Sequence, residues 1–392
     1  MGRMETGIKY FLLSFLLSVV SCVSGTKDSN GKVEAETTLV YDQSNELTLK
    51  YSDLFSGVEL IPLDTTGDFL VTRIRQMKFA LDHFFIQDED KQLFVFDRQG
   101  KGCCIINKQG SGAEEYLSIR GFDVQEVDST ICLFTYPKRM MRFSLDGKLL
   151  DVSDMEVDGF DLLFLKDRSW AIFTDNVNED PQLLAVSDLS TGKTSRYIPG
   201  YRSFAGRKLP VYQQARFFSR LPNGEVLFFH PLSNLIYTVS SDGVSVKYLI
   251  DFGKNNPPVE YPEDMPPMSQ VDDFVEKNQR VYGFNSCWEN DKFFYIQTKV
   301  DDKLVDILWD KEKQILYSGY FKDDLTECQV FLSGVTDSYL AGYITVDVVM
   351  ELVDYLKSRS TKDAELTLQK LGKLADYTEN EGNPIVCLYH FK

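Results

Sequence analysis

The densest group of cationic and aromatic side chains lies in the segment GYRSFAGRKLPVYQQAR, residues 200–216. Arginine and lysine recognise anions through charge-assisted hydrogen bonds, and aromatic rings offer flat faces for cations and sugars. In an otherwise acidic chain, this composition could bind an anionic or carbohydrate ligand, or it could pack on the surface with its cations balancing carboxylates. The candidate ligand-binding residues are Tyr201, Arg202, Arg207 and Tyr212, together with Trp288 in YGFNSCWEN (282–290).

Trp288 has two interpretations. It could be a stacking platform for the ligand, or it could fill space at the end of a strand. The sequence alone leaves both open.

The other polar motifs form no catalytic or metal-binding signature. TDNVNEDP (174–181) offers the oxygen donors that calcium prefers, but Val177 interrupts the required alternation, so a polar turn is the simpler interpretation. The three histidines lie far apart in the sequence, and GxSxG, HExxH, P-loop and GxGxxG motifs do not occur. We therefore expect no catalytic residue, no metal and no other cofactor, which favours a binding protein over an enzyme.

The elements that must position these residues are short strands joined by tight turns. The hairpin LFVFDRQGKGCCII (93–106) recurs around turn glycines at positions 100, 147, 192 and 243, at intervals of 47, 45 and 51 residues. A period of 40–50 residues built from short strands is typical of β-propeller blades, which are four-stranded antiparallel sheets. Glycine suits these turns because it accepts a positive φ.

Five complete blades and one interrupted blade can be read from residue 71 to the C-terminus. Residues 346–375 interrupt the last blade with apolar side chains at helical spacing, and IVCLYHF (385–391) resumes it. The segment VELIPLD (58–64) can supply the missing edge strand, so that strands from both termini close the ring. The predicted fold is an all-β, six-bladed propeller with a helical insertion in the last blade.

Long connections are expected on one rim of this propeller, which carries the loops between blades and those between second and third strands. Binding usually resides in long loops on a rigid scaffold. The predicted binding face comprises residues 108–119, 199–213, 253–279 and the 346–375 insert.

The N-terminus has the form of a lipoprotein signal. Arg3 and Lys9 precede an apolar stretch over 10–20 that is too short to span a bilayer, and small residues lie just before Cys22. This pattern predicts lipid attachment at Cys22, with residues 23–37 as a flexible polar tether. The expected location is the cell envelope, at the outer membrane, on its periplasmic or surface face. An ordinary signal peptide is the alternative.

Charge and cysteine content limit the partners. The net charge of −17 argues against nucleic acid, because phosphate binding needs a basic footprint. The six cysteines after Cys22 lack framework spacing, so most are expected to be buried free thiols. Adjacent Cys103 and Cys104 should point to opposite faces of their strand.

Several segments resemble the six-bladed, NHL-like β-propeller lipoproteins of Bacteroidetes. They are HFFIQDEDKQLFVFDRQGK, INKQGSGAEEYLSIRGFDV, YSDLFSGVELIPLD, VKYLIDFG and NPIVCLYHFK. The resemblance covers residues 45–392 and rests on structural motifs, so it implies the propeller fold and no settled activity. Members carry Gly-Pro-Gly-Glu-Tyr where this chain has QGSGAEEY (109–116), and the missing proline leaves that φ unrestrained.

Together these observations predict a signal peptide (1–22), a tether (23–37) and a propeller (38–392). The expected function is that of a lipid-anchored, monomeric binding module for a glycan, a peptide or an envelope protein. The alternative is a propeller hydrolase or lactonase that holds a metal in its central channel.

Overall fold

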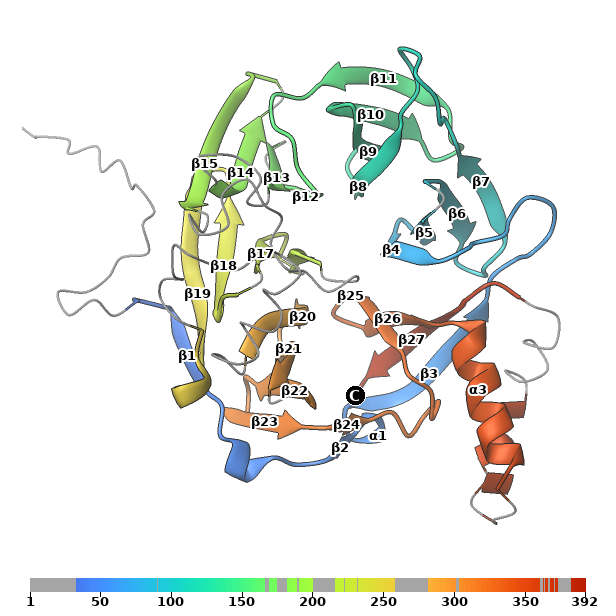
Figure 1. The fold of residues 1–392 in the computed structure, drawn as a ribbon, viewed down its shortest axis with the longest axis vertical. Helices are drawn as coiled ribbons and strands as arrows, with labels where there is room; N and C mark the ends of the chain where they lie inside the picture. The colour runs from blue at the N-terminus through green and yellow to red at the C-terminus, as the bar shows by residue number, and fades with distance from the viewer. Residues whose placement is uncertain are drawn as a thin grey trace, which may run out of the picture.

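Six four-stranded antiparallel sheets surround a common axis, as the blades of a propeller (Figure 1). The first strand of each blade lies nearest the axis, and the other three follow outward. The predicted six-bladed fold is thereby confirmed. This computed structural model describes residues 33–392 except 90, 166–168, 175–181, 189, 200–215, 222, 231, 258–280, 301–302, 360–361, 363, 366, 370 and 373–381.

The first three blades follow one another without interruption by another element. Blade one contains β4 (Ile74–Ala80), β5 (His83–Asp88), β6 (Leu93–Asp97) and β7 (Gly102–Ile106). Blade two contains β8 (Ser118–Gln125), β9 (Thr130–Tyr136), β10 (Arg139–Ser144) and β11 (Leu149–Asp154). Blade three contains β12 (Asp161–Phe164), β13 (Ser169–Phe173), β14 (Gln182–Asp188) and β15 (Lys193–Pro199).

The last three blades carry the additions to the basic plan. Blade four contains β16 (Phe218–Arg220), β17 (Val226–Phe228), β18 (Leu235–Ser240) and β19 (Gly243–Asp251), followed by the short helix η3 (Gly253–Asn255). Blade five contains β20 (Val281–Glu289), β21 (Phe293–Val300), β22 (Lys303–Asp310) and β23 (Ile315–Gly319). Blade six contains β25 (Phe331–Val335), β26 (Tyr339–Ile344), β27 (Ile385–Phe391) and the N-terminal strand β3 (Phe55–Pro62).

Blade six closes the ring in the predicted way. Its outermost strand, β3, pairs antiparallel with β27, so that Pro62 lies opposite Ile385 and Phe55 opposite Phe391. Both chain ends therefore contribute to one sheet. This arrangement covers an edge that would otherwise present unpaired backbone groups.

The segment before β3 runs along three blades. The strand β1 (Thr37–Val40) pairs in parallel with β19 of blade four, as a fifth strand of that sheet. The short helix η1 (Gln43–Asn45) follows, and the amide of Leu47 then donates to the carbonyl of Ser318 in blade five at 2.7 Å. The strand β2 (Leu49–Lys50) pairs with β24 (Phe321–Lys322), and α1 (Tyr51–Leu54) leads into β3.

The recurring outer hairpin serves as a contact between blades. In blade one, Gly100 has φ +83° and lies so close to the end of β3 that an added Cβ would meet the Pro62 carbonyl oxygen at 2.4 Å. The amide of Asp64 donates to the Gly100 carbonyl at 2.8 Å. At the equivalent turn of blade two, the carbonyl oxygen of Leu145 accepts from the thiol of Cys104 at 3.3 Å, and Cys104 lies on β7 of blade one. Each of these two turns therefore contacts the outermost strand of the preceding blade.

Buried apolar side chains form six clusters, each between two neighbouring blades. The cluster between blades five and six also receives α3 (Val346–Lys357), which follows β26. This helix buries Val349, Val353 and Leu356, three of the residues whose spacing predicts it. Its remaining faces carry charged residues, as expected for an amphipathic helix that packs on a sheet.

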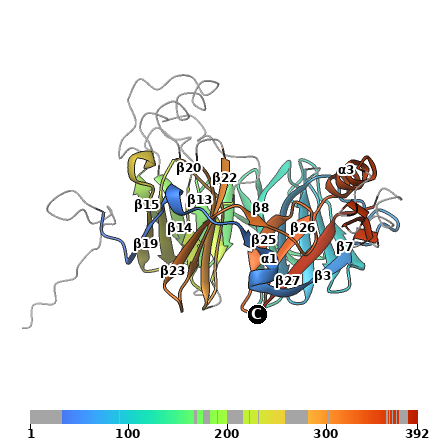
Figure 2. The ribbon, with the colours of Figure 1, turned by 90° about the horizontal axis from the view of Figure 1, so that it is seen from below.

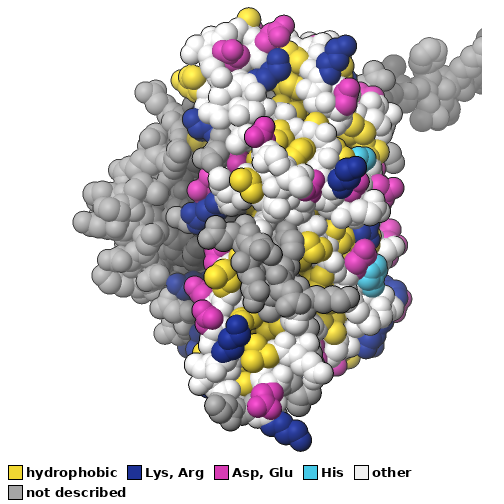
Figure 3. Space-filling view, turned by 90° about the vertical axis from the view of Figure 1, so that its right-hand side faces the viewer, with side chains coloured by type: hydrophobic (Ala, Val, Ile, Leu, Met, Phe, Trp, Pro, Cys, Tyr) yellow, Lys and Arg dark blue, Asp and Glu magenta, His cyan; other side chains and the backbone are white. Residues whose placement is uncertain are grey.

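The propeller has two distinct faces. We call the face at which the first strands begin the loop face, and α3 lies on it (Figure 2). We call the opposite face, at which the first strands end, the turn face, and the C-terminus lies there. On the side wall shown in Figure 3, lysine and arginine side chains are interspersed with aspartate and glutamate. In the described part of the chain, no helix is both long enough and apolar enough to span a bilayer.

Candidate functional site

A cavity of about 650 Å³ lies at the centre of the ring. First strands from all six blades line it, so its position follows from the propeller fold itself. Its polar lining includes Lys78 from blade one, Asp123 from blade two, Asp161 from blade three, Arg216 and Arg220 from blade four, Asn285 from blade five and Ser333 from blade six. A cavity of this size matches the usual range for small-molecule sites, roughly 300–1,000 Å³.

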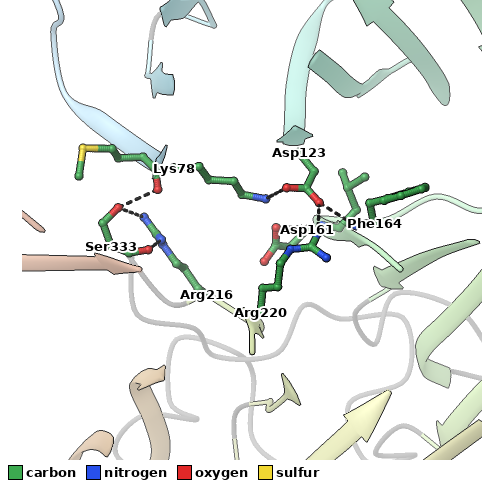
Figure 4. A network of polar contacts seen from close by, with 9 residues as sticks. Lys78, Asp123, Asp161, Phe164, Arg216, Arg220 and Ser333 are labelled. Carbon is green, nitrogen blue, oxygen red and sulfur yellow. Dashed lines mark hydrogen bonds and ion pairs between the residues drawn. The ribbon is translucent and has the colours of Figure 1, made fainter. Parts of the chain in front are cut away.

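Asp123 is the centre of the charged network in this cavity (Figure 4). One carboxylate oxygen, Oδ1, accepts from the Lys78 ammonium at 2.9 Å. The other, Oδ2, accepts from the Arg220 guanidinium at 2.9 Å and from the amide of Phe164 at 2.8 Å. Burial would raise the pKa of Asp123, but the charges of Lys78 and Arg220 outweigh it and hold that pKa below its ordinary value.

Asp161 lies beside this network in a different environment. Its carboxylate accepts from the amide of Leu162 at 2.9 Å and from the amide of Phe217 at 3.3 Å. Only 8 % of the residue is exposed, and burial raises its pKa despite the charge of Lys78. Asp161 therefore joins blade three to the chain that enters blade four, without the direct cation partners of Asp123.

Arg216 reaches across the cavity to blade six. Its guanidinium donates to the carbonyl oxygen of Ser333 and, at 3.2 Å, to the Ser333 hydroxyl. That hydroxyl donates in turn to the carbonyl oxygen of Met77 in blade one at 2.7 Å. Figure 4 shows the Arg216 side chain directed away from Asp123 and toward Ser333. Burial lowers the pKa of Arg216, although Tyr343 and Asp161 oppose that effect.

Blade five contributes two polar atoms that have no hydrogen-bond partner among the residues that the structure describes. The side-chain oxygen of Asn285 and the indole nitrogen of Trp288 are both buried, and both residues line the cavity. Buried polar groups in folded proteins are almost always hydrogen-bonded. Both atoms are enclosed by the surrounding protein, so they do not face the open space of the cavity.

The candidate stacking residue Trp288 lies inside the protein. It is 3 % exposed, and its ring stacks on Tyr295 with centroids 5.0 Å apart. Trp288 belongs to the apolar cluster between blades five and six and also lines the cavity. The ring therefore fills space between the blades, and its role as a stacking platform for a ligand stays a prediction.

The other four candidate ligand-binding residues, Tyr201, Arg202, Arg207 and Tyr212, lie outside the described residues, as does Cys22. The same holds for residues 175–181 of the segment weighed as a calcium loop.

The described parts of the predicted binding face lie away from the cavity. Loop 108–119 is held to blade two: the guanidinium of Arg139 on β10 donates to the carbonyl oxygens of Gly112 and Ala113 at 3.2 Å each. None of the described residues of the four predicted segments lines the cavity. Its lining extends instead to the turn face, through turns that contribute Glu126 and Val127, Asn223 and Gly224, and Thr336 and Asp337.

The metal-dependent alternative finds no cluster of ligands in the described ranges. No group of three or more histidine, cysteine, aspartate or glutamate residues there could hold a metal ion. The two carboxylates that the first strands contribute to the cavity are occupied by hydrogen-bond donors: Asp123 by two cations and an amide, and Asp161 by two amides.

The charged residues of the first strands were not among the predicted site residues. A signal for two of them is visible in the sequence: Gly-Phe-Asp occurs at 121–123 and again at 159–161, at the start of consecutive blades. Lys78 and Arg220 are likewise charges on first strands, in β4 and β16. A charge that recurs on the first strand of successive blades is therefore the pattern that locates this site.

No curated protein matches the chain. Among solved structures, it is similar to a protein from Bacteroides fragilis named as a "putative exported protein", with 16% identity and a TM-score of 0.67, covering 91% of this chain and 100% of that one. A member of the DUF4221 family from Bacteroides vulgatus is 11% identical, with a TM-score of 0.48, over 86% of this chain and 97% of that one.

These similarities to solved structures concern the fold alone. A family model, by contrast, matches residues 36–390, which is nearly the whole described propeller. The chain therefore belongs to the family described as domain of unknown function DUF4934.

Proposed function

We propose that this protein is a binding protein whose central cavity holds a small molecule. The observation that carries the proposal is the cavity of about 650 Å³ on the axis of the ring, where first strands from all six blades converge and where Arg216 has no carboxylate partner among the described residues. The surrounding first strands form a rigid frame, which limits the entropy lost on binding.

The proposed location is the cell envelope, with the protein anchored by lipid at Cys22. This rests on the basic, apolar and small-residue pattern of residues 1–22 and on the resemblance to NHL-like lipoproteins. The fold shared with an exported Bacteroides fragilis protein is consistent with it. The loop face, with Tyr201, Arg202, Arg207 and Tyr212, is proposed as a second contact surface for a glycan, a peptide or an envelope protein.

A variant that fills the cavity tests the ligand site. Ser286 lines the cavity, whereas Ser245 is exposed on β19, so Ser286→Trp and Ser245→Trp add the same side chain inside and outside it. Each folded protein is dialysed against a small-molecule extract of bacterial envelopes, and the retained compounds are identified by mass spectrometry. We expect the wild type and Ser245→Trp to retain the same compound and Ser286→Trp to lose it. Retention by both variants, or by none of the three proteins, would refute the cavity as a binding site.

Two further variants test the loop face and the anchor. Arg202→Ala combined with Arg207→Ala should weaken binding to a glycan and peptide array, and unchanged binding would remove these residues from the site. Cys22→Ser should lose incorporation of labelled palmitate and move the protein from the membrane to the soluble fraction. Retention of both the label and the membrane association would refute the lipid anchor.

A further inference from the structure

We infer that the central cavity binds a small organic monocarboxylate, whose carboxylate pairs with Arg216. This inference rests on the proposed function and names the class of ligand. Its starting point is the incomplete pairing of the Arg216 guanidinium. Arginine has five N–H donors, and the described contacts of Arg216 are only those to the carbonyl and hydroxyl oxygens of Ser333.

The neighbouring cations have a counterion that Arg216 lacks. Lys78 and Arg220 each lie 2.9 Å from an oxygen of Asp123. Among the described residues, no carboxylate oxygen lies within ion-pair distance of Arg216. Arg216 is partly buried, and a partly buried charge without a paired counterion is unfavourable. An anionic ligand at Arg216 would therefore supply the missing counterion.

The charges around Arg216 favour an anion with a single charge over a dianion. Three cations line the cavity, Lys78, Arg216 and Arg220, together with four carboxylates, Asp123, Glu126, Asp161 and Asp337. Lys78 and Arg220 pair with Asp123, so Arg216 is the cation of this group that has no paired carboxylate among the described residues. A dianionic phosphate ester would bring a second negative charge among these carboxylates, whereas a monocarboxylate brings only the charge that pairs with Arg216.

The geometry of arginine also suits a carboxylate. The planar guanidinium presents its donors as a fork that matches the two oxygens of a carboxylate, which gives direction as well as charge. Ser333 holds the Arg216 side chain across the cavity and so fixes this fork before a ligand arrives. A positioned arginine loses less entropy on binding than a free one.

The remaining lining defines the body of the ligand. Apolar side chains from four blades face the cavity: Phe79, Leu162, Phe218 and Leu332. The ligand that fits therefore has an acid group and an apolar or aromatic body.

Calorimetric titration with defined probes tests the inference. The probes are hexanoate, benzoate, phenylacetate and 4-hydroxyphenylacetate, each compared with its uncharged primary amide, and phenyl phosphate as the dianion. We expect at least one carboxylate to bind the full-length Cys22→Ser protein at least tenfold more tightly than its amide and than phenyl phosphate. Arg216→Met should weaken that binding by about 10- to 100-fold, the effect expected of charge-assisted hydrogen bonds.

Two controls keep the result interpretable. Arg196→Met makes the same change at an exposed arginine of β15 and should leave binding unchanged. Arg216→Lys keeps the charge but loses the fork, so it should bind more weakly than the wild type and more tightly than Arg216→Met. Circular dichroism and the unfolding midpoint establish that each variant is folded; if Arg216→Met is not, Arg216→Lys decides the comparison.

Three results would overturn the inference: no carboxylate binds, the amide binds as tightly as its acid, or the folded Arg216 variants bind like the wild type. Tighter binding of phenyl phosphate would overturn the assignment of a single charge. If the carboxylate inference fails while Ser286→Trp still abolishes retention of an extracted compound, the proposed function stands and only the ligand class is wrong.

Discussion

Arg220 of blade four and Asp123 of blade two form an ion pair at 2.9 Å, although 97 residues separate them in the chain. Blade three lies between these two blades in the ring, and the amide of its Phe164 donates to the same carboxylate. Lys78 adds blade one to the network. Four of the six blades therefore meet at a single carboxylate on the axis of the ring.

Replacement of Asp123 by asparagine should destabilise the protein by about 3 kcal/mol, because breaking a buried ion pair leaves its partner charges uncompensated. The side chain of Asp123 is 5 % exposed and that of Lys78 is 15 %, but that of Arg220 is 35 %, so water relieves part of the cost. Urea unfolding measures the change. Asp154→Asn, at a side chain that is 93 % exposed, is the matched control and should change stability by less than about 0.5 kcal/mol. Equal effects of the two substitutions would contradict the central role of Asp123.

The contribution of Asp123 should depend on pH in one direction. Its pKa is lower in the folded protein than its ordinary value, so the unfolded chain takes up the proton first as the pH falls. The stabilisation is therefore fully present above about pH 5, since the unfolded pKa is about 3.9, and it is lost as the pH falls through the folded pKa. The difference in unfolding free energy between wild type and Asp123→Asn should shrink between pH 5 and pH 3. A difference that grows over this range would contradict the assignment.

Two turn glycines offer a matched test of the contact between blades. Gly100 and Gly192 both have positive φ, +83° and +69°, so alanine strains the backbone at each by a comparable amount of about 1 kcal/mol. Only at Gly100 would the new Cβ also meet backbone, the Pro62 carbonyl at 2.4 Å, whereas nothing lies within 4 Å at Gly192. Thermal unfolding should therefore show a clearly larger loss for Gly100→Ala than for Gly192→Ala. Equal losses would mean that the hairpin of blade one does not support the closing strand β3.

Thiol reactivity should distinguish Cys103 from the other cysteines of the propeller. Cys103 is exposed, while Cys132, Cys287, Cys328 and Cys387 are buried. Burial raises the pKa of Cys104 to about 11 and that of Cys132 to about 12, which leaves almost no reactive thiolate at pH 8. In the Cys22→Ser protein, a disulfide reagent should label one thiol rapidly and the others only after denaturation. Cys103→Ser should remove the rapid phase, and its persistence would contradict the described exposure.

Much of the architecture could be predicted because its signals are local. Alternating apolar residues and the turn glycines at 100, 147, 192 and 243 specify hairpins within each blade, and their period specifies the repeat. The closing strand followed from counting strands, since a blade with one strand missing must take it from the other terminus. The parallel pairing of β1 with β19 was not predicted, because β1 is only four residues long and directly follows the polar tether.

The candidate site could be predicted only in part. Trp288 was selected as an aromatic near a long insertion, and it does border the cavity, but its burial against Tyr295 depends on how blades five and six pack. The predicted binding face, which includes residues 199–213 and 253–279, contains no complete first strand. Charges such as Lys78 and Arg220 read individually as ordinary surface residues, since a strand does not reveal which of its faces borders the axis.

The sequence by itself determined the repeat, the strand order within each blade and the partnership of the two termini, because alternation, turn chemistry and chain order are local or countable properties. Only the tertiary structure decided that Lys78, Asp123, Asp161, Arg216 and Arg220 meet in one cavity. The physical reason is closure of the ring: six first strands converge on one axis, and the low-dielectric interior then makes each unpaired charge or polar atom consequential. That convergence gives Arg216, which has no carboxylate partner among the described residues, its place in the proposed site.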